Sequence, residues 1–273
     1  MIRFRLSGLN GWHDCQRRVA FGSLKDHVSG LSDIERSTAS HIGSAVGTAS
    51  HAGAEYLLKA KKDDKIATVT DAEEYAVDEF LGELNNSEFC FDDQTCDRNE
   101  AIQQIRQITR IFEAYMLDKL NPLRIEERFN YIMGCVEFSG QIDLQTKDLC
   151  LWDLKTSKLL GSFFAQIGGY SIAINKSDID TGESCNVIHI PRLKIKKAPY
   201  VHEVTYGTLD CEKVAKKYMA QIERLFSTFL DCENPNIFNA NPSSTLCSNK
   251  YCPIFGTEFC SVSRMNPKIN KVL

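Results

Sequence analysis

The sequence has 273 residues, of which 43% are hydrophobic and 25% charged. This composition is typical of a globular chain that can bury one sizeable core or two small ones. The opening residues, MIRFRLSGLNGWHD, lack the apolar stretch of a signal peptide, and no apolar run approaches the ~20 residues that span a bilayer. We therefore expect no membrane partner. Eleven cysteines without an export signal favour reduced thiols, a metal or cluster site, and a cytoplasmic location.

The net charge of −4 is distributed unevenly along the chain. Residues 63–100 carry 13 acidic side chains against Lys65 and Arg98, a local charge of −11 that leaves +7 for the remainder. The acidic part is typical of a solvated surface, whereas the remainder is basic enough to form a nucleic-acid groove. The composition therefore permits nucleic-acid binding without demonstrating it.

Hydrophobic periodicity predicts an alternation of helices and strands. Residues 1–46 contain Cys15 and then a polar loop. Apolar residues at helical spacing predict helices at 47–60, 71–84, 100–120, 162–175 and 210–230, with a polar loop at 85–99. Alternating apolar residues predict strands at 124–131, 136–145, 149–156, 184–194 and 200–205. This order predicts one α/β domain, a mixed sheet flanked by helices, with an N-terminal segment (1–46), a core (47–230) and a cysteine-rich segment (231–273).

The hairpin expected at residues 137–158 carries the main candidate site. Asp153 and Lys155 are two residues apart on one strand, so their side chains share a face. A connecting loop with an odd number of residues would place Asp143 opposite Asp153 on that face. Two carboxylates and an ammonium suit a site for Mg²⁺ or Mn²⁺. The alternative is the exposed polar face of an edge hairpin.

Three motifs stand in order along the chain. Gly140 and Asp143 form G-x-I-D, and the next strand ends in D-x-K-T-S from Asp153. His51 lies four residues after Gly47 on the first expected helix, and Gln166 precedes Tyr170 by four residues on a later one. Together these motifs resemble the RecB-like branch of the PD-(D/E)xK nuclease superfamily, over roughly residues 47–195. The resemblance implies a restriction-endonuclease-like core.

The resemblance also implies roles for these residues. His51, Asp143, Asp153 and the carbonyl of Leu154 would bind one or two Mg²⁺ or Mn²⁺ ions. Lys155 would position the attacking water or neutralise charge on the phosphorane. The Gln166 and Tyr170 pair would lie by the active site and contact the DNA backbone. Glu126 or Glu127 on the preceding strand could be a further acid near the site, and surface charge is the favoured alternative.

Three cysteines near the C-terminus, Cys247, Cys252 and Cys260, lie within fourteen residues of one loop-like segment. A fourth ligand is needed, and Cys15 is the candidate. One cysteine before the core and three after it resemble the iron–sulfur members of the RecB-like nucleases, which implies a [4Fe–4S] cluster. Zinc is the alternative, with His13 or Cys15 as the fourth ligand.

A basic run, PRLKIKKAPY at residues 191–200, is the candidate nucleic-acid surface. On a strand Arg192, Lys194 and Lys196 would share a face and could contact phosphates, and Arg17 and Arg18 could extend the track. A solvated edge strand protected by lysines has the same pattern. No element that reads bases is visible, so we expect binding without sequence specificity.

The chain has no G-x-x-x-x-G-K-[ST] helicase motif. The resemblance therefore implies a stand-alone exonuclease that acts on DNA, single-stranded or with free ends, in recombination, repair, phage replication or CRISPR adaptation. It also implies a recombination or CRISPR partner protein. The alternatives are an endonuclease or an RNA-acting nuclease of the same fold, and an iron–sulfur protein that binds nucleic acid without cleaving it.

Overall fold

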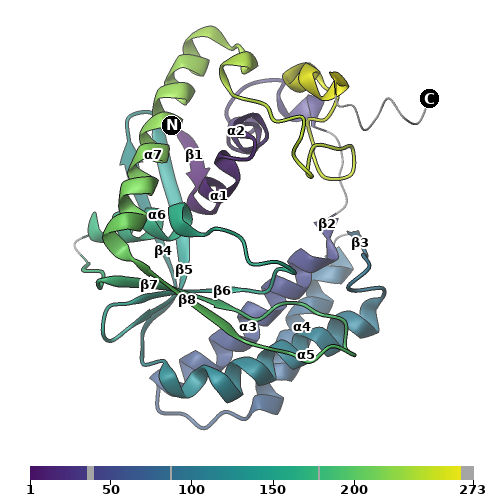
Figure 1. Ribbon diagram of the computed structural model, residues 1–273, viewed down its shortest axis with the longest axis vertical. Coiled ribbons are helices and arrows are strands. Elements are labelled where there is room, and N and C mark those ends of the chain that lie inside the picture. The colour runs from purple at the N-terminus through teal and green to yellow at the C-terminus, as the bar shows by residue number, and fades with distance from the viewer. Residues whose placement is uncertain (36–39, 87, 178, 266–273) are drawn as a thin grey trace.

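The computed structural model describes residues 1–35, 40–86, 88–177 and 179–265 (Figure 1). The expected N-terminal and cysteine-rich segments are therefore described except for residues 36–39 and 266–273. Helices in the described residues are α1 (Leu9–Trp12), α2 (Gln16–Leu24), α3 (Ile42–Lys62), α4 (Val69–Asn86), α5 (Arg98–Tyr115), α6 (Phe164–Asn175) and α7 (Thr208–Cys232). Strands are β1 (Ile2–Arg5), β2 (Ser40–His41), β3 (Phe89–Cys90), β4 (Pro122–Met133), β5 (Val136–Thr146), β6 (Leu151–Lys155), β7 (Ser184–His189) and β8 (His202–Gly207).

Six strands form one mixed sheet whose centre is β5. Strand β4 pairs with one edge of β5 along its whole length. The other edge of β5 is shared, because β1 pairs with residues 136–139 and β6 pairs only with residues 144–145. Residues 140–143 lie between these two stretches and pair with neither strand. The sheet continues from β6 through β7 to β8.

Two helical layers cover the sheet and enclose two apolar cores (Figure 1). Helices α6 and α7 pack on one face, where Phe138, Val187 and Phe226 are buried. Helices α3, α4 and α5 pack on the other face, where Leu154 and Ile188 are buried. Each fully buried side chain of this size contributes roughly 2 kcal/mol to folding. The predicted mixed sheet with flanking helices is therefore confirmed.

The two glycines of α6 allow close helix packing. A Cβ added at Gly168 would lie 2.1 Å from the carbonyl oxygen of Cys211 in α7, so only glycine permits this approach. A Cβ at Gly169 would lie 2.8 Å from side-chain atoms of Leu6 and Leu9. The two glycines thus let α6 lie close to α7 and to the N-terminal segment.

Helix α2 of the N-terminal segment lies next to the described part of the cysteine-rich segment (Figure 1). The rings of Phe21 in α2 and Phe259 near the C-terminus are 5.3 Å apart. Asp14 accepts a hydrogen bond of 2.7 Å from the hydroxyl of Ser244. The N-terminal segment also supplies β1 to the sheet, a strand that the sequence analysis missed and that lies outside the expected core of 47–230.

The predicted elements are present, with shifted ends. Helix α3 begins at Ile42, earlier than expected, because His41 caps it and its Nδ1 accepts from the amide of Gly43. Strand β7 ends at His189 rather than Lys194, and β8 begins at His202 rather than Tyr200. None of the described helices is both long and apolar enough to span a membrane.

Candidate metal centre

The hairpin of β5 and β6 has the geometry that aligns its two aspartates. Leu144 pairs with Trp152 and Gln145 with Leu151, so five residues, 146–150, form the connection. Five is an odd number, as the alignment of the two aspartates requires. Continuing the same register places Asp143 opposite Asp153. The ladder stops there, and Asp143 Oδ2 accepts a hydrogen bond of 2.7 Å from the backbone N–H of Leu154.

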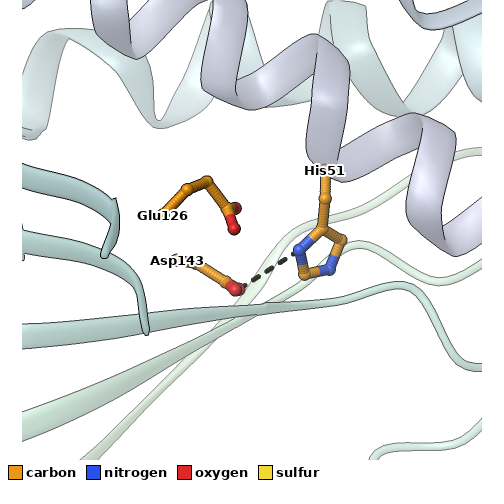
Figure 2. A group of neighbouring side chains, drawn as sticks. All are labelled: His51, Glu126 and Asp143. Carbon is orange, nitrogen blue, oxygen red and sulfur yellow. Dashed lines mark ion pairs between the residues drawn. The ribbon is translucent and has the colours of Figure 1, made fainter. Parts of the chain in front are cut away.

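A histidine and two carboxylates converge beside this position (Figure 2). One ligand atom from each of His51, Glu126 and Asp143 lies within 4.8 Å of the others. His51 projects from α3, whereas Glu126 and Asp143 come from β4 and β5. His51 Nδ1 lies 3.4 Å from Asp143 Oδ2. An imidazole and two carboxylates at this spacing are a suitable ligand set for a divalent cation.

Of the two acids on β4, Glu126 is the one that lies near the site, where surface charge was the favoured alternative. The β4–β5 register pairs Ile125 with Leu144 and Glu127 with Ile142, which places Glu126 opposite Asp143. Its φ is +51°, a left-handed conformation that costs a non-glycine residue about 1 kcal/mol or more within a strand. Its carboxylate accepts a hydrogen bond of 2.5 Å from the amide of Gln141. Glu127, in contrast, has a side chain that is 42% exposed and pairs with Arg124.

Asp153 and Lys155 form a buried ion pair next to this group. Lys155 Nζ lies 2.6 Å from Asp153 Oδ2. The amide of Gln166 donates to Asp153 Oδ1 at 3.3 Å and to the hydroxyl oxygen of Tyr170 at 2.7 Å. Gly140 makes room for this arrangement, since a Cβ there would lie 2.7 Å from the ring of Tyr170. The predicted residues of the three motifs therefore meet at one place.

The protonation states follow from burial and from neighbouring charges. Burial by itself lowers the pKa of His51, but the charge and hydrogen bond of Asp143 outweigh it and raise the pKa to about 9. Burial and the Asp143 carboxylate raise the pKa of Glu126 to about 7. Burial raises the pKa of Asp153 to about 6, although the Lys155 ammonium opposes this shift. The group thus holds protons near neutral pH that a bound cation would displace.

Lys155 and Tyr170 keep their protons. Burial opposes the charge of Lys155, but the carboxylates of Asp153 and Asp143 outweigh it and raise its pKa above the usual range. Burial also raises the pKa of the Tyr170 phenol above its usual range. At neutral pH the site therefore presents a fixed ammonium and a neutral hydroxyl beside the carboxylates.

The centre opens into a hollow of about 640 Å³. Its wall includes His51, Glu126, Asp143, Leu154 and Lys155, together with Tyr75 from α4. A ligand can therefore reach the convergent carboxylates from solvent.

The four predicted cluster ligands also come together. Cys15, Cys247, Cys252 and Cys260 line one small hollow with Arg18. Burial, together with Cys260 and Cys15, raises the pKa of Cys252 to about 11. Among the residues that the structure describes, no three of these thiols lie within 4.8 Å of one another.

The predicted phosphate track is not assembled as expected. Arg192 lies beyond the end of β7 and is buried, and its Nη2 is 2.6 Å from Asp92 Oδ2. Arg17 is also buried and donates to the carbonyl oxygen of Phe238. These two arginines hold loops together and cannot present a charge to a phosphate. Arg18 pairs with Asp14, while Lys194 and Lys196 are exposed on a loop.

The chain is similar to solved structures. A crystal structure of a protein from Eubacterium rectale, named "Putative exonuclease", superposes with a TM-score of 0.55 at 10% sequence identity, covering 90% of this chain and 86% of that one. The chain shares this fold. A second structure, of SSO0001, has 10% identity and covers 76% of this chain and 84% of that one, but its TM-score of 0.26 does not indicate a shared fold. No family model and no curated protein sequence gives a significant match.

The residues present fit a divalent cation. One imidazole nitrogen and two carboxylate oxygens lie close together, and the raised pKa values of His51 and Glu126 mean that both groups hold protons that a cation would displace. Asp153 lies outside the group of three but adjoins it through Asp143. Glu126, for which surface charge was the favoured alternative, thus takes a place among the candidate ligands.

Proposed function

We propose that this protein is a nuclease that hydrolyses phosphodiester bonds of DNA with the help of Mg²⁺ or Mn²⁺. The observation that carries the proposal is the convergence of His51, Glu126 and Asp143 beside the Asp153–Lys155 pair. The fold shared with the Eubacterium rectale protein supports the same reading, and the name of that protein favours an exonuclease.

The ligand set we propose is His51, Glu126, Asp143 and Asp153, with the carbonyl of Leu154 as a further ligand. When bound, the cation would lower the pKa of its water and offset the charge of the scissile phosphate. Orientation of the substrate and stabilisation of the developing charge depend on this chain's own side chains.

Lys155 supplies electrostatic stabilisation rather than base catalysis. Its raised pKa keeps it cationic, so it cannot accept a proton at neutral pH. As an ammonium fixed by Asp153 it can orient the attacking water or stabilise the charge that develops on the phosphorane. Gln166 holds Asp153 in place and leaves the neutral hydroxyl of Tyr170 as a hydrogen-bond donor for a phosphate oxygen.

We further propose a [4Fe–4S] cluster bound by Cys15, Cys247, Cys252 and Cys260. Thiolates at the two ends of the chain would cross-link the N-terminal segment to the C-terminal one, where their side chains already pack together. Anaerobically purified protein should then be brown, absorb near ~400 nm and contain iron. Stoichiometric zinc without iron would instead support the zinc alternative.

A cleavage assay tests the nuclease proposal. Wild-type protein is incubated with Mg²⁺ or Mn²⁺ and with end-labelled linear and covalently circular DNA, each single- and double-stranded. Exonuclease action releases label from linear DNA and leaves circles intact, whereas an endonuclease opens the circles. Matched RNA identifies an RNA-acting enzyme. Protein that binds DNA but cleaves none of these substrates would be a binding protein, and the proposal would be wrong.

A further inference from the structure

The layer of α3, α4 and α5 leaves part of its sheet face open. On β1 the side chains alternate, with Ile2 and Phe4 buried in the opposite core and Arg3 and Arg5 exposed. Arg128 of β4 is exposed as well. These three arginines come from neighbouring positions around the first half of β5, the half that the three helices do not cover.

The arginines line a hollow of about 520 Å³. Its wall also contains the polar side chains of Ser7, Asn130, Ser139 and Tyr170. A second hollow of about 590 Å³ shares Arg3, Arg5 and Ser7 with the first. We call the surface formed by Arg3, Arg5 and Arg128 the arginine groove.

Charge in the arginine groove is predominantly positive. In the first hollow the one lining carboxylate, Glu137, is already engaged by Arg3 at 3.3 Å and by Asn130 at 2.9 Å, and the second hollow is lined by Asp26 together with Lys25. Within the described part of the chain, Arg5 and Arg128 form no ion pair with a carboxylate. Guanidinium groups that are exposed and not neutralised are suited to bidentate contact with phosphates.

The arginine groove leads directly to the metal centre. Along β5, Ser139, Gln141 and Asp143 are successive residues on one face, and about 14 Å of strand separates the first from the last. Gln141 lines both the groove and the catalytic hollow. Its side chain accepts from Arg128 at 3.1 Å and donates to Glu126 at 2.5 Å.

The other rim of the catalytic hollow has the opposite charge. It is formed by α3 and α4 and includes Glu79 and also Glu55, which pairs with Lys59. Helix α4 belongs to the 63–100 segment, whose net charge is −11. Phosphates are therefore repelled from this rim and attracted to the arginine rim, so the field favours one direction of approach.

We propose that the arginine groove binds the sugar–phosphate backbone of the strand that is cut and guides it past Gln141 to the metal centre. This inference rests on the proposed nuclease function, since it assigns the path of the substrate to that site. It replaces Arg192 and Arg17 of the predicted track with Arg3, Arg5 and Arg128. The contacts are to phosphates only, so binding is independent of sequence and sensitive to salt.

Binding measured without cleavage tests the groove separately from catalysis. Fluorescence anisotropy with a short fluorescein-labelled single-stranded DNA in EDTA compares wild type with Arg3→Ala/Arg5→Ala. The charge-matched control is Arg98→Ala/Arg106→Ala, two exposed arginines on α5. We expect the groove variant to bind at least about tenfold more weakly than the control. The slope of log K against log salt should become shallower by about 1.4, because each lost phosphate contact on a single strand contributes about 0.7.

Two further variants make the outcome decisive. The Arg5→Lys variant keeps the positive charge and should retain most of the wild-type affinity for DNA. The Lys194→Ala/Lys196→Ala variant tests whether the basic loop binds DNA instead. In cleavage assays of the Arg3→Ala/Arg5→Ala variant, the factor by which KM rises should be about ten times the factor by which kcat falls. If the lysine variant loses binding and the groove variant does not, the groove assignment is wrong while the nuclease stands. If wild type binds DNA but cuts nothing, the nuclease proposal fails and the binding comparison still decides the groove.

Discussion

Glu126 lies opposite Asp143 across the β4–β5 ladder, and it does so with a backbone φ of +51°. An extended residue at this position would keep its side chain in the regular alternation of the strand. The left-handed conformation instead accompanies a carboxylate that approaches both Asp143 and His51. Backbone strain and charge repulsion therefore occur at one point, and neither favours folding. Such a combination is expected of a binding site.

Replacing Glu126 by Gln should remove cation binding and stabilise the metal-free protein. The folded-state pKa of about 7 exceeds the ordinary value of 4.5, so this group favours folding below pH 4.5 and loses that contribution as the pH rises through 7. At pH 8 the metal-free variant should unfold with a free energy higher than wild type by on the order of 1–2 kcal/mol. Denaturant unfolding with and without Mg²⁺ measures both effects.

The control for this prediction is Glu127→Gln, which removes a neighbouring but half-exposed carboxylate. It should keep the Mg²⁺-dependent gain in stability, which is about 2.7 kcal/mol at a concentration one hundred times Kd. An equal Mg²⁺ response in both variants would exclude Glu126 as a ligand.

Affinity for the cation should rise with pH in a defined way. His51, with a pKa of about 9, and Glu126, with a pKa of about 7, must both lose a proton to act as ligands. Between pH 7 and 8 one proton is displaced, and the association constant for Mn²⁺ should increase about tenfold per pH unit. Below pH 7 the dependence should steepen. Calorimetric titration in buffers of different ionisation enthalpy counts the released protons, and a flat profile would contradict the ligand set.

Lys155→Ala should lower kcat by about 10² or more while the protein stays folded. The ammonium is fixed beside the carboxylates by its 2.6 Å contact with Asp153, so its charge is available to the transition state without rearrangement. Lys158→Ala removes an exposed ammonium three residues further on and serves as the control. Single-turnover cleavage and circular dichroism provide the comparison. Wild-type digestion by pure Lys155→Ala protein would refute the assigned role.

Arg192→Ala should destabilise the fold by about 3 kcal/mol. Its guanidinium forms a buried pair with Asp92 and lies against the hydroxyl of Thr95, so removing it leaves a buried carboxylate without its cation. Burial by itself raises the pKa of Asp92, but the hydrogen bond and the charge of Arg192 outweigh burial and hold this pKa below its usual range. This contribution is present above pH 4 and is lost as the pH falls through the lowered pKa. Urea unfolding at neutral and acid pH measures it, and an unchanged midpoint would contradict the buried pair.

Cys252→Ser should abolish iron binding and weaken the contact between the chain ends. Its thiol is buried in the hollow that Cys15 and Cys260 also line, so a hydroxyl there cannot replace a thiolate ligand. Cys232→Ser, on the exposed end of α7, is the control and should retain iron. Iron content and absorbance near ~400 nm decide the outcome. Equal iron in both variants would show that Cys252 is not a ligand.

The sequence by itself determined which residues share a local element. The period of two in a strand places Asp153 and Lys155 on one face. The sequence left the position of Asp143 dependent on the length of the connection, and the structure shows five residues there, which place Asp143 opposite Asp153. Helical spacing of four likewise sets Gln166 beside Tyr170, which the structure joins by a hydrogen bond. The alternation of helices and strands predicted the mixed sheet with helices on both faces. These relationships depend on backbone geometry over a few residues, which a sequence displays directly.

Tertiary structure alone decided the rest, because it depends on contacts between distant segments. The role of Glu126 follows from one residue with positive φ inside a strand, and no local pattern marks that conformation. Arg192 has the appearance of a surface cation until Asp92, a hundred residues earlier, is seen to neutralise it. Arg5 belongs beside the site only because β1 pairs with β5 across more than a hundred residues of chain. Charge and burial at such positions depend on the residue that packs against them. Local hydrophobic periodicity does not indicate which distant segments pair.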